Sequence, residues 1–222
     1  MANTFDVIAI HGKGGSGKSW LAGMLAWLFR MGPDSHGQAA ITIAQLYKQL
    51  NLEPLGVMPV EIVALSGTLK EWLYATGRCN ETDILADQKT KEQRHVFTFH
   101  GDSLRREQGQ NYFCRSLYAR MVLSAKVNNT GLFIIPDLRE KHEMEFLRAM
   151  RSEGYINELR LITVYAPRRT TLALSQQVGD DEEARVQQSS HSSEVGLDDI
   201  TKDRETAEAH GFIFFDNDIK GN

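Results

Sequence analysis

Short apolar runs alternate along this chain with longer stretches in which apolar residues recur every three or four positions. The apolar runs predict five strands, at residues 5–10, 61–65, 132–135, 159–165 and 212–215. The periodic stretches predict helices at residues 18–31, 41–50, 68–75, 112–125 and 142–151. Strands that alternate with helices predict an α/β protein of three layers, with a central parallel sheet of about five strands covered on both faces.

Two polar stretches and one unusually apolar helix complete this pattern. Residues 80–109 predict helices and loops around a short apolar patch at 96–99. Residues 176–205 are polar and highly charged, which predicts a mobile loop or a lid. The predicted helix at 18–31 is apolar nearly all round, which favours a central helix packed on the sheet. A loop is predicted at 33–38.

Length and charge limit the classes of partner. The chain has 222 residues, enough for one domain, and 25 basic against 29 acidic residues give a net charge of −4. A mildly acidic chain is a poor candidate for binding nucleic acid through an extended surface, but it can contain a small basic pocket that binds an anion. The most apolar stretch is much shorter than the roughly twenty residues that cross a bilayer. We therefore expect small-molecule partners, no nucleic acid and no membrane, and a monomer or a homodimer.

The cysteines and the beginning of the chain bear on the compartment. Cys79 and Cys114 match neither a CxxC nor a zinc-ligand spacing. Two thiols in a chain of this length favour a reducing, cytoplasmic setting. The chain begins without a basic region followed by a long apolar run, so no secretory signal is predicted.

A glycine-rich motif lies between the first predicted strand and the first predicted helix. Residues 12–19, GKGGSGKS, match G-x-x-x-x-G-K-[ST], in which backbone N–H groups wrap phosphate oxygens. We expect positive φ angles, and hence a need for glycine, at Gly12, Gly14, Gly15 and Gly17. The positive end of the helix then faces the anion, Lys18 reaches the β- and γ-phosphates, and the Ser19 hydroxyl binds Mg²⁺. The predicted ligands are ATP and Mg²⁺, and the predicted contacts are Gly12, Lys13, Gly14, Gly15, Ser16, Gly17, Lys18 and Ser19.

The lysine at the second position of the motif opens an alternative. With Lys13 the loop reads KGGSGKS, which resembles the deviant phosphate loop of the ParA/MinD-type partitioning ATPases. That resemblance implies a nucleotide-dependent switch, in which the extra lysine acts across a dimer. In that family an apolar strand ending in acidic residues follows the first helix closely. Here residues 33–50 predict a loop and an amphipathic helix instead.

A second acidic and basic pair follows the third predicted strand. Asp137 ends the apolar run LFIIPD, where a carboxylate near the metal is expected, so it is predicted to bind Mg²⁺ or to orient the acceptor oxygen. A capping or turn role for an Asp after Pro is an equally good interpretation. The guanidinium of Arg139 can hold a phosphate with two hydrogen bonds, or it is a solvated surface group.

Several segments together resemble a known family. PDLREKHEMEFLRAM (136–150), HSSEVGLDD (191–199) and FFDND (214–218) resemble the phage and bacterial deoxynucleoside monophosphate kinases. LSGTLKEWL (65–73) and NYFCRSL (111–117) fit that family too, and they resemble the animal-type phosphomevalonate kinases at least as well. Both families are P-loop kinases that phosphorylate a phosphate monoester with ATP. The chain departs from both in residues 33–60 and in having Ser19, where many relatives carry Asp.

The resemblance implies a fold and a set of site residues. The fold is a P-loop NTPase of the nucleoside monophosphate kinase type, a single kinase domain over 1–222 with an acceptor-binding insert at about 66–128 and a lid loop at about 168–205. The implied acceptor-phosphate residues are Lys70, Arg105, Arg106, Arg115 and Arg139. The implied catalytic residues are Lys18, Asp137, Arg139 and Arg168, with Arg169 beside the last. Asn217 and Asp218 are expected near the adenine, and His191 and Glu194 belong to a family motif without a derived role.

The leading hypothesis is therefore an ATP-dependent kinase whose acceptor is a nucleoside or deoxynucleoside monophosphate. Phosphomevalonate is the alternative acceptor, and the nucleotide switch is the alternative class. The aromatic side chains available in the predicted insert do not decide between a base and an isoprenoid acid; they are Trp72, Tyr74, Tyr112 and Phe113.

Overall fold

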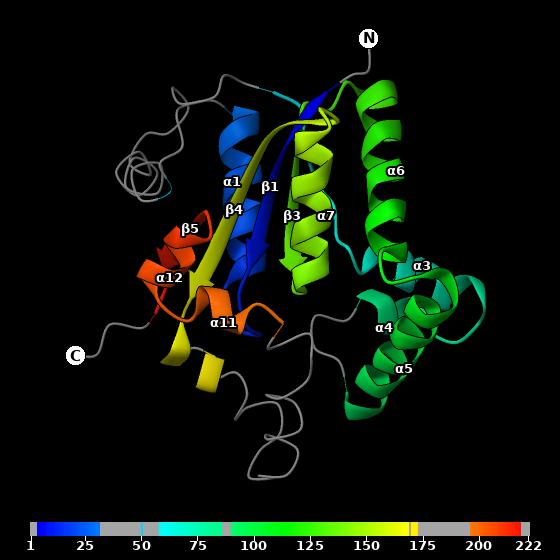
Figure 1. Ribbon diagram of the computed structural model, residues 1–222. Coiled ribbons are helices and arrows are strands. Elements are labelled where there is room, and N and C mark those ends of the chain that lie inside the picture. The colour runs from blue at the N-terminus through cyan, green and yellow to red at the C-terminus, as the bar shows by residue number, and fades with distance from the viewer. Residues whose placement is uncertain are drawn as a thin grey trace.

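A parallel sheet runs through the molecule with helices on both faces (Figure 1). The structure, a computed structural model, describes residues 4–31, 50, 58–85, 90–168, 170–172 and 196–218. The strands are β1 (Phe5–His11), β2 (Val60–Ile62), β3 (Leu132–Leu138), β4 (Ile156–Tyr165) and β5 (Phe212–Asp216). The helices are α1 (Lys18–Met31), α3 (Gly67–Ala75), α4 (Glu81–Leu85), α5 (Lys91–Gln108), α6 (Tyr112–Asn128), α7 (Lys141–Ser152), α11 (Asp198–Thr201) and α12 (Arg204–Ala209).

The sheet has the order β2-β3-β1-β4-β5, and every neighbouring pair is parallel. The central strand β1 places Ile8 opposite Ile134 of β3, and Ile10 opposite Ile162 of β4. Because all strands run the same way, their carboxyl ends share one edge of the sheet. In Figure 1 the arrowheads of β1, β3 and β4 point to this carboxyl edge, at the bottom of the view.

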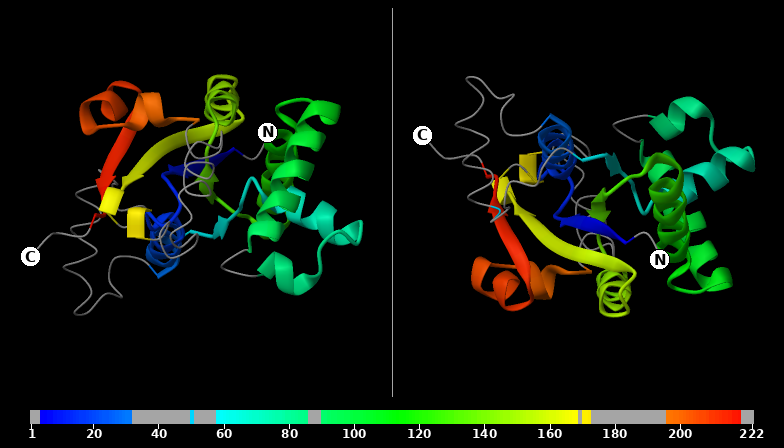
Figure 2. Two further views of the ribbon diagram at one scale, coloured as in Figure 1. Left: turned by 90° about the horizontal axis from the view of Figure 1, so that it is seen from below. Right: turned by 90° about the horizontal axis from the view of Figure 1, so that it is seen from above.

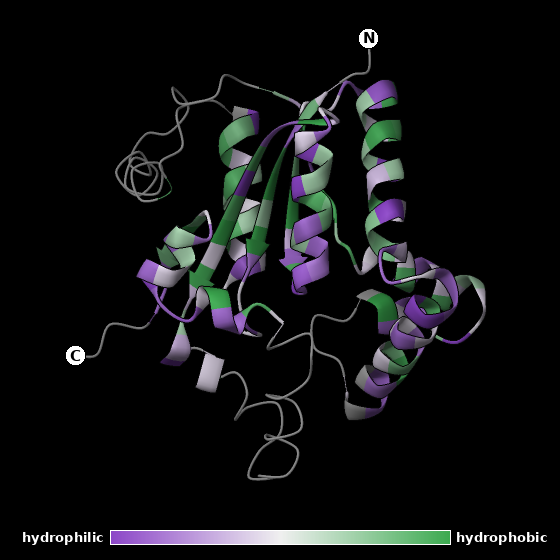
Figure 3. Ribbon diagram, in the orientation of Figure 1, coloured by the Kyte–Doolittle hydropathy of each residue, from purple (hydrophilic) through white to green (hydrophobic). Residues whose placement is uncertain are grey.

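Alternate side chains of β1 pack into two separate hydrophobic cores, one on each face of the sheet. Val7 and Ala9 are buried with residues of α6, α7, α11 and α12, whereas Ile8 and Ile10 are buried with residues of α1. The views from below and above show the sheet between these two helical layers (Figure 2). The central strand β1 is coloured apolar, as is the half of β4 nearer the carboxyl edge (Figure 3). The prediction of a three-layer α/β fold around a five-stranded parallel sheet is confirmed.

A group of helices, α3 to α6, lies beside the β2 and β3 side of the sheet, and we call it the helical arm (residues 67–128). It has a small core of its own, in which Leu69, Leu73, Leu104 and Phe113 are buried. A hydrogen bond of 2.7 Å joins the hydroxyls of Thr68 in α3 and Ser116 in α6. The helical arm lies within the predicted acceptor-binding insert, 66–128.

The second strand differs from its prediction. It covers Val60–Ile62 rather than 61–65, because the chain leaves the sheet to begin α3. The amide groups of Leu65 and Ser66 donate to the Asp137 carboxylate instead of continuing the ladder. The other predicted strands are confirmed, and each extends slightly beyond its predicted range.

The prediction that α1 packs on the sheet is confirmed, although its apolar surface is not all covered. Leu21, Leu25 and Leu28 are fully buried against the sheet, but Trp20 is 50% exposed and Trp27 is 39% exposed. Because two residues seven positions apart lie on the same side of a helix, the two indoles form one outward stripe. The bounds of α1 are as predicted, and the helices at 68–75, 112–125 and 142–151 are also confirmed.

The charged stretch 176–205 contains helices in its described part, so the prediction of a mobile loop is wrong for residues 198–201 and 204–205. Its described part contains α11 and the beginning of α12, which Asp203 caps by accepting a hydrogen bond from the Thr206 N–H at 2.8 Å. Leu197 and Ile200 are buried in the core that α6 and α7 share. Residues 176–195 lie outside the described residues, as do the predicted loop at 33–38 and most of the predicted helix at 41–50.

Candidate functional site

The predicted site residues from four different strands meet at the carboxyl edge of the sheet. The glycine loop, residues 12–17, follows β1, and Asp137 and Arg139 lie at and after the end of β3. The register places His11 opposite Leu138, so these two segments leave the sheet side by side. The remaining predicted residues at this edge follow β4 and β5; they are Arg168 and Asn217. In open α/β sheets ligands bind at this edge.

The glycine loop has the backbone that its motif requires at three of four predicted positions. Gly12, Gly15 and Gly17 have φ angles of 148°, 78° and 98°, in the region that disfavours side chains. Gly14 is not among the residues with positive φ, so that part of the prediction is wrong. A Cβ on Gly12 would lie 2.8 Å from the carbonyl oxygen of Val164, so the loop passes close over the end of β4.

Inside the glycine loop lies a buried polar atom. Ser16 is 1% exposed, and its hydroxyl oxygen has no hydrogen-bond partner among the described residues. Burying an unpaired hydroxyl is costly, and such groups are rare in folded proteins. The loop also leads directly into α1, and the first turn of an α-helix has backbone N–H groups without a partner inside the helix, together with positive dipole charge. This donor set fits a polyphosphate.

Both lysines of the loop have defined contacts. The Lys18 ammonium donates to the carbonyl oxygens of Gly12 and Lys13, the latter at 2.7 Å, so its side chain lies across the loop. The Lys13 ammonium forms an ion pair of 2.9 Å with Asp198 of α11. Ser19, the predicted magnesium ligand, is exposed on the first turn of α1. A hydroxyl there and a carboxylate at Asp137 are oxygen donors of the kind that Mg²⁺ uses.

Asn217 braces the loop from the end of β5. Its side-chain amide donates to the Ser16 carbonyl oxygen at 2.8 Å, and its backbone N–H donates to Tyr165 O at 2.9 Å. The amide nitrogen also occupies the space beside Gly17, where a Cβ would come within 2.5 Å of it. Asn217 was predicted to approach adenine, and this geometry gives it a second role in holding the loop.

We expect Asn217→Ala to weaken the loop more than the fold. Losing one hydrogen bond to the Ser16 carbonyl lowers the free energy of unfolding by about 1 kcal/mol, and we expect KM for ATP to rise several-fold. Urea unfolding and ATP titration measure the two effects. Asn157→Ala is the matched control, because its amide donates to Asp6 at 2.9 Å at the other end of the sheet. An equal rise of KM in both variants would contradict the assignment.

The Asp137 carboxylate holds the entry to the helical arm. Its two oxygens accept hydrogen bonds from Leu65 N–H at 2.8 Å and from Ser66 N–H at 3.0 Å. These bonds join two distant segments, with partners 72 and 71 positions earlier, so they differ from the local capping or turn role that the sequence left open. Each carboxylate oxygen keeps a further lone pair, so the predicted contact with Mg²⁺ is compatible with these bonds. Within the described part of the chain, no group of three or more His, Cys, Asp or Glu side chains is arranged to hold a metal ion.

Sequence reasoning missed a buried carboxyl beside this edge. Glu143, in the first turn of α7, is only 3% exposed, and one of its oxygens accepts hydrogen bonds from the backbone N–H groups of Arg139 and Glu140, at 2.9 and 3.0 Å. Burial raises its pKa to about 7, and the Asp137 charge adds to that rise. The signal was present, because Glu143 falls on the inward face of α7, four residues before the buried Leu147.

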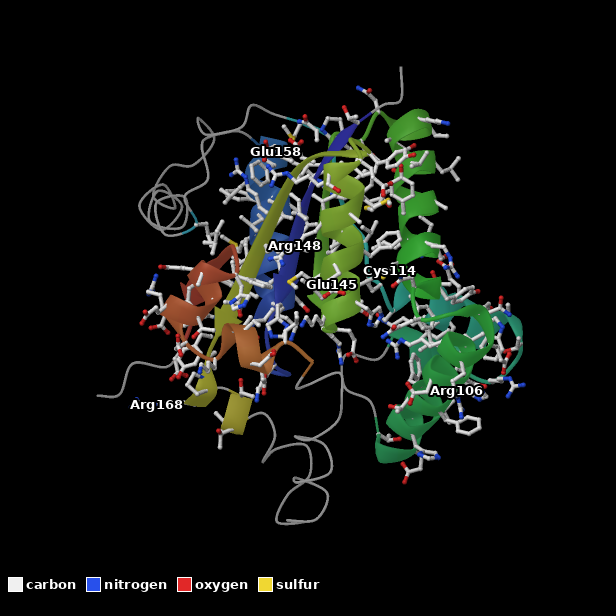
Figure 4. The ribbon with its side chains drawn as sticks, viewed as in Figure 1. Arg106, Cys114, Glu145, Arg148, Glu158 and Arg168 are labelled. Atoms are coloured by element: carbon white, nitrogen blue, oxygen red, sulfur yellow. The ribbon has the colours of Figure 1, made fainter. Side chains whose placement is uncertain are left out.

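The predicted acceptor residues of the helical arm divide into two kinds. Arg106 and Arg115 are exposed, and the Arg115 guanidinium donates to the Gln108 carbonyl at 2.7 Å (Figure 4 labels Arg106 on α5). Arg105 instead turns inward, with 29% of its side chain exposed and its guanidinium 5.2 Å from the centre of the Phe113 ring. Lys70 is half-buried on α3. Of the two described arginines at 105 and 106, Arg105 is therefore the one that turns toward Glu143 of α7.

The end of β4 carries the predicted lid arginine. Arg168 is exposed after the end of β4 (Figure 4). Its backbone N–H donates to the Asp218 carboxylate at 2.9 Å. This bond ties the segments that follow β4 and β5. Arg169, His191 and Glu194 lie outside the described residues.

Comparison with known proteins adds no family to this description. No family model matches the chain, and no curated protein matches it significantly. The class that the fold defines is a three-layer α/β protein with a five-stranded parallel sheet. Among the helices of the described ranges, none combines the length and the apolar character needed to cross a membrane.

Proposed function

We propose that this protein is an ATP-dependent phosphotransferase that moves the γ-phosphoryl group to a small phosphate monoester, with a nucleoside or deoxynucleoside monophosphate as the leading acceptor. Its fold is then a P-loop fold of the nucleoside monophosphate kinase type. The observation that carries the proposal is the glycine loop at the N-terminus of α1. It has three glycines at positive φ, and the buried Ser16 hydroxyl has no hydrogen-bond partner in the described ranges. Asp137 and Arg139 supply acidic and basic groups at the same edge of the sheet.

The chemistry requires positive charge between two anions. A phosphate oxygen of the acceptor forms a bond to the γ-phosphorus, the bond to the β–γ bridging oxygen breaks, and ADP leaves with that electron pair. The donor and acceptor repel each other, so catalysis depends on positioning and on charge stabilisation. In the proposal, Lys18 neutralises the transferring group and Arg139 holds the acceptor, while Arg168 approaches from the end of β4. Mg²⁺, near Ser19 and Asp137, supplies further neutralisation when bound.

The partitioning switch is the alternative class, and Lys13 is the residue that tests it. In the switch hypothesis this lysine acts across a dimer; within the single chain its ammonium pairs at 2.9 Å with Asp198. Phosphomevalonate remains the alternative acceptor, because the inward-turned Arg105 suits the phosphate of either acceptor.

An acceptor panel tests the proposal. ADP release from ATP and Mg²⁺ is measured with each ribo- and deoxyribonucleoside monophosphate, with phosphomevalonate, and with no acceptor. We expect one group of acceptors to raise ADP release far above the rate without acceptor, and the phosphorylated product to appear in equal amount. ADP release that no acceptor stimulates, together with ATP-dependent dimers in sizing chromatography, would favour the switch and overturn the proposal.

A further inference from the structure

Two carboxylates of one short segment join the carboxyl edge of the sheet to the helical arm. Asp137, at the end of β3, holds the backbone that enters α3. Glu143, six residues later in α7, directs its second oxygen to Arg105 of α5, with 3.9 Å between that oxygen and the guanidinium nitrogen Nη2. The arm and the sheet edge therefore meet through groups that also neighbour Arg139.

The guanidinium of Arg105 is held in place, but its hydrogen-bond donors are not all used by the described residues. Its Nη1 lies 3.3 Å from an oxygen of Asp102, its Nη2 is at 3.9 Å from Glu143, and its buried Nε has no hydrogen-bond partner among the described residues. The guanidinium lies over the Phe113 ring, which fixes its plane. An arginine has five N–H donors in a rigid fork, and these contacts are long for charge-assisted bonds. The site thus keeps donor capacity for a further anion.

Glu143 acts on both arginines at once. It accepts the backbone N–H of Arg139, so it sets the turn that carries that side chain, and its other oxygen faces the Arg105 guanidinium. We propose that Glu143 is a positioning residue for the acceptor, fixing the Arg139 turn and aiming Arg105 at the acceptor phosphate. This inference rests on the proposed function, because it assigns no reaction of its own.

The test replaces Glu143 with glutamine. In Glu143→Gln an amide oxygen still accepts the two backbone N–H groups, but the charge that faces Arg105 is lost. The probe is whichever of dAMP, dGMP, dCMP and dTMP gives the highest turnover with the unmodified protein. At pH 8 we expect KM for this acceptor to rise about tenfold, as for the loss of one charge-assisted contact, with KM for ATP unchanged and kcat within about twofold.

A pH series separates positioning from support of the fold. Burial raises the pKa of Glu143 to about 7, so its charge is lost as pH falls below that value. The ratio of acceptor KM in Glu143→Gln to that in the unmodified protein is then expected to fall toward one between pH 8 and pH 5.5. The ratio cancels the titration of the acceptor phosphate itself, which both proteins share.

Titration of the other groups near Glu143 is not expected to produce the same pH dependence of the KM ratio. The charged and titratable groups around it are Asp137 from β3, Arg105 from α5, Cys114 from α6, and His142 and Glu140 beside it. Burial, followed by the Glu143 charge, raises the pKa of Cys114 to about 12, so that thiol stays neutral throughout the series. The other four are present in both proteins and contribute to both KM values.

Matched controls keep the inference falsifiable. Glu145→Gln removes an exposed carboxylate from the same helix (Figure 4), and it is expected to leave all constants within about twofold. If Glu143→Gln does not fold, Arg105→Gln removes the charge from the other side of the same contact and is expected to raise the same KM. A ratio that stays constant with pH, or an equal loss for ATP and acceptor, would overturn the inference alone. If no acceptor of the panel is phosphorylated, phosphomevalonate included, the proposed function itself is wrong.

Discussion

Replacing Lys18 with alanine is expected to lower ATP-dependent phosphoryl transfer by about 10²–10³-fold, the size found when one preorganised charge-stabilising donor is removed. The Lys18 ammonium lies across the glycine loop, in contact with the Gly12 and Lys13 carbonyl oxygens, at the N-terminus of α1. A phosphate there would place its developing charge beside the ammonium. The measurement is kcat/KM for ATP at saturating acceptor, with the best acceptor of the panel.

Two further lysine variants serve as a control for Lys18→Ala and as a test of the kinase against the switch hypothesis. Lys126→Ala removes an exposed lysine from the last turn of α6 and serves as the control for charge and folding. Lys13→Ala breaks the ion pair with Asp198, and a kinase is expected to lose less than about tenfold in transfer, the scale of an exposed ion pair. A switch of the partitioning type loses its dimer and its hydrolysis instead. Full transfer activity in Lys18→Ala would contradict the assignment of the glycine loop.

The fold could be predicted where the pattern that specifies an element lies within a few neighbouring residues. The strand, glycine loop and helix over residues 5–31 were predicted within one residue, because an apolar run, a motif and a helical period follow one another without a gap. The exposure of Trp20 could not be predicted in this way, since a helix that is apolar all round does not reveal which stripe meets the sheet. The burial of Ile200 was missed for the opposite reason, because one apolar residue among many charges looks like part of a loop.

The sequence predicts that the candidate site lies at the carboxyl edge of the sheet, but it does not predict which side chains contact one another there. Parallel strands bring their carboxyl ends together, so a motif after β1 and an acid at the end of β3 were bound to be neighbours once the topology was known. The contacts between distant segments carry no local signal. Asp137 bonds to residues 72 and 71 positions earlier, and Asn217 bonds across 201 positions. Glu143 carried a signal, a charge on an apolar stripe, which is rare enough to single out a buried carboxyl.

The change expected to disturb the folded structure most is Gly12→Ala. The φ angle of 148° disfavours any side chain, and the added Cβ would lie 2.7 Å from the Ser16 hydroxyl and 2.8 Å from the Val164 carbonyl oxygen. The Val164 carbonyl belongs to the backbone of a buried strand, so it cannot move aside. Backbone strain and overpacking together are expected to lower the free energy of unfolding by about 4 kcal/mol. Urea unfolding followed by circular dichroism measures the loss.

Gly23→Ala provides a control of opposite sign. A Cβ at Gly23 meets nothing within 4 Å, and the position lies inside α1, where alanine is favoured over glycine by about 1 kcal/mol. The two variants add the same methyl group to neighbouring parts of the chain, so a general effect of substitution would move both in one direction. Opposite shifts locate the constraint in the close approach of the glycine loop to β4. Equal unfolding midpoints for Gly12→Ala and the unmodified protein would show that the loop does not pass over that strand.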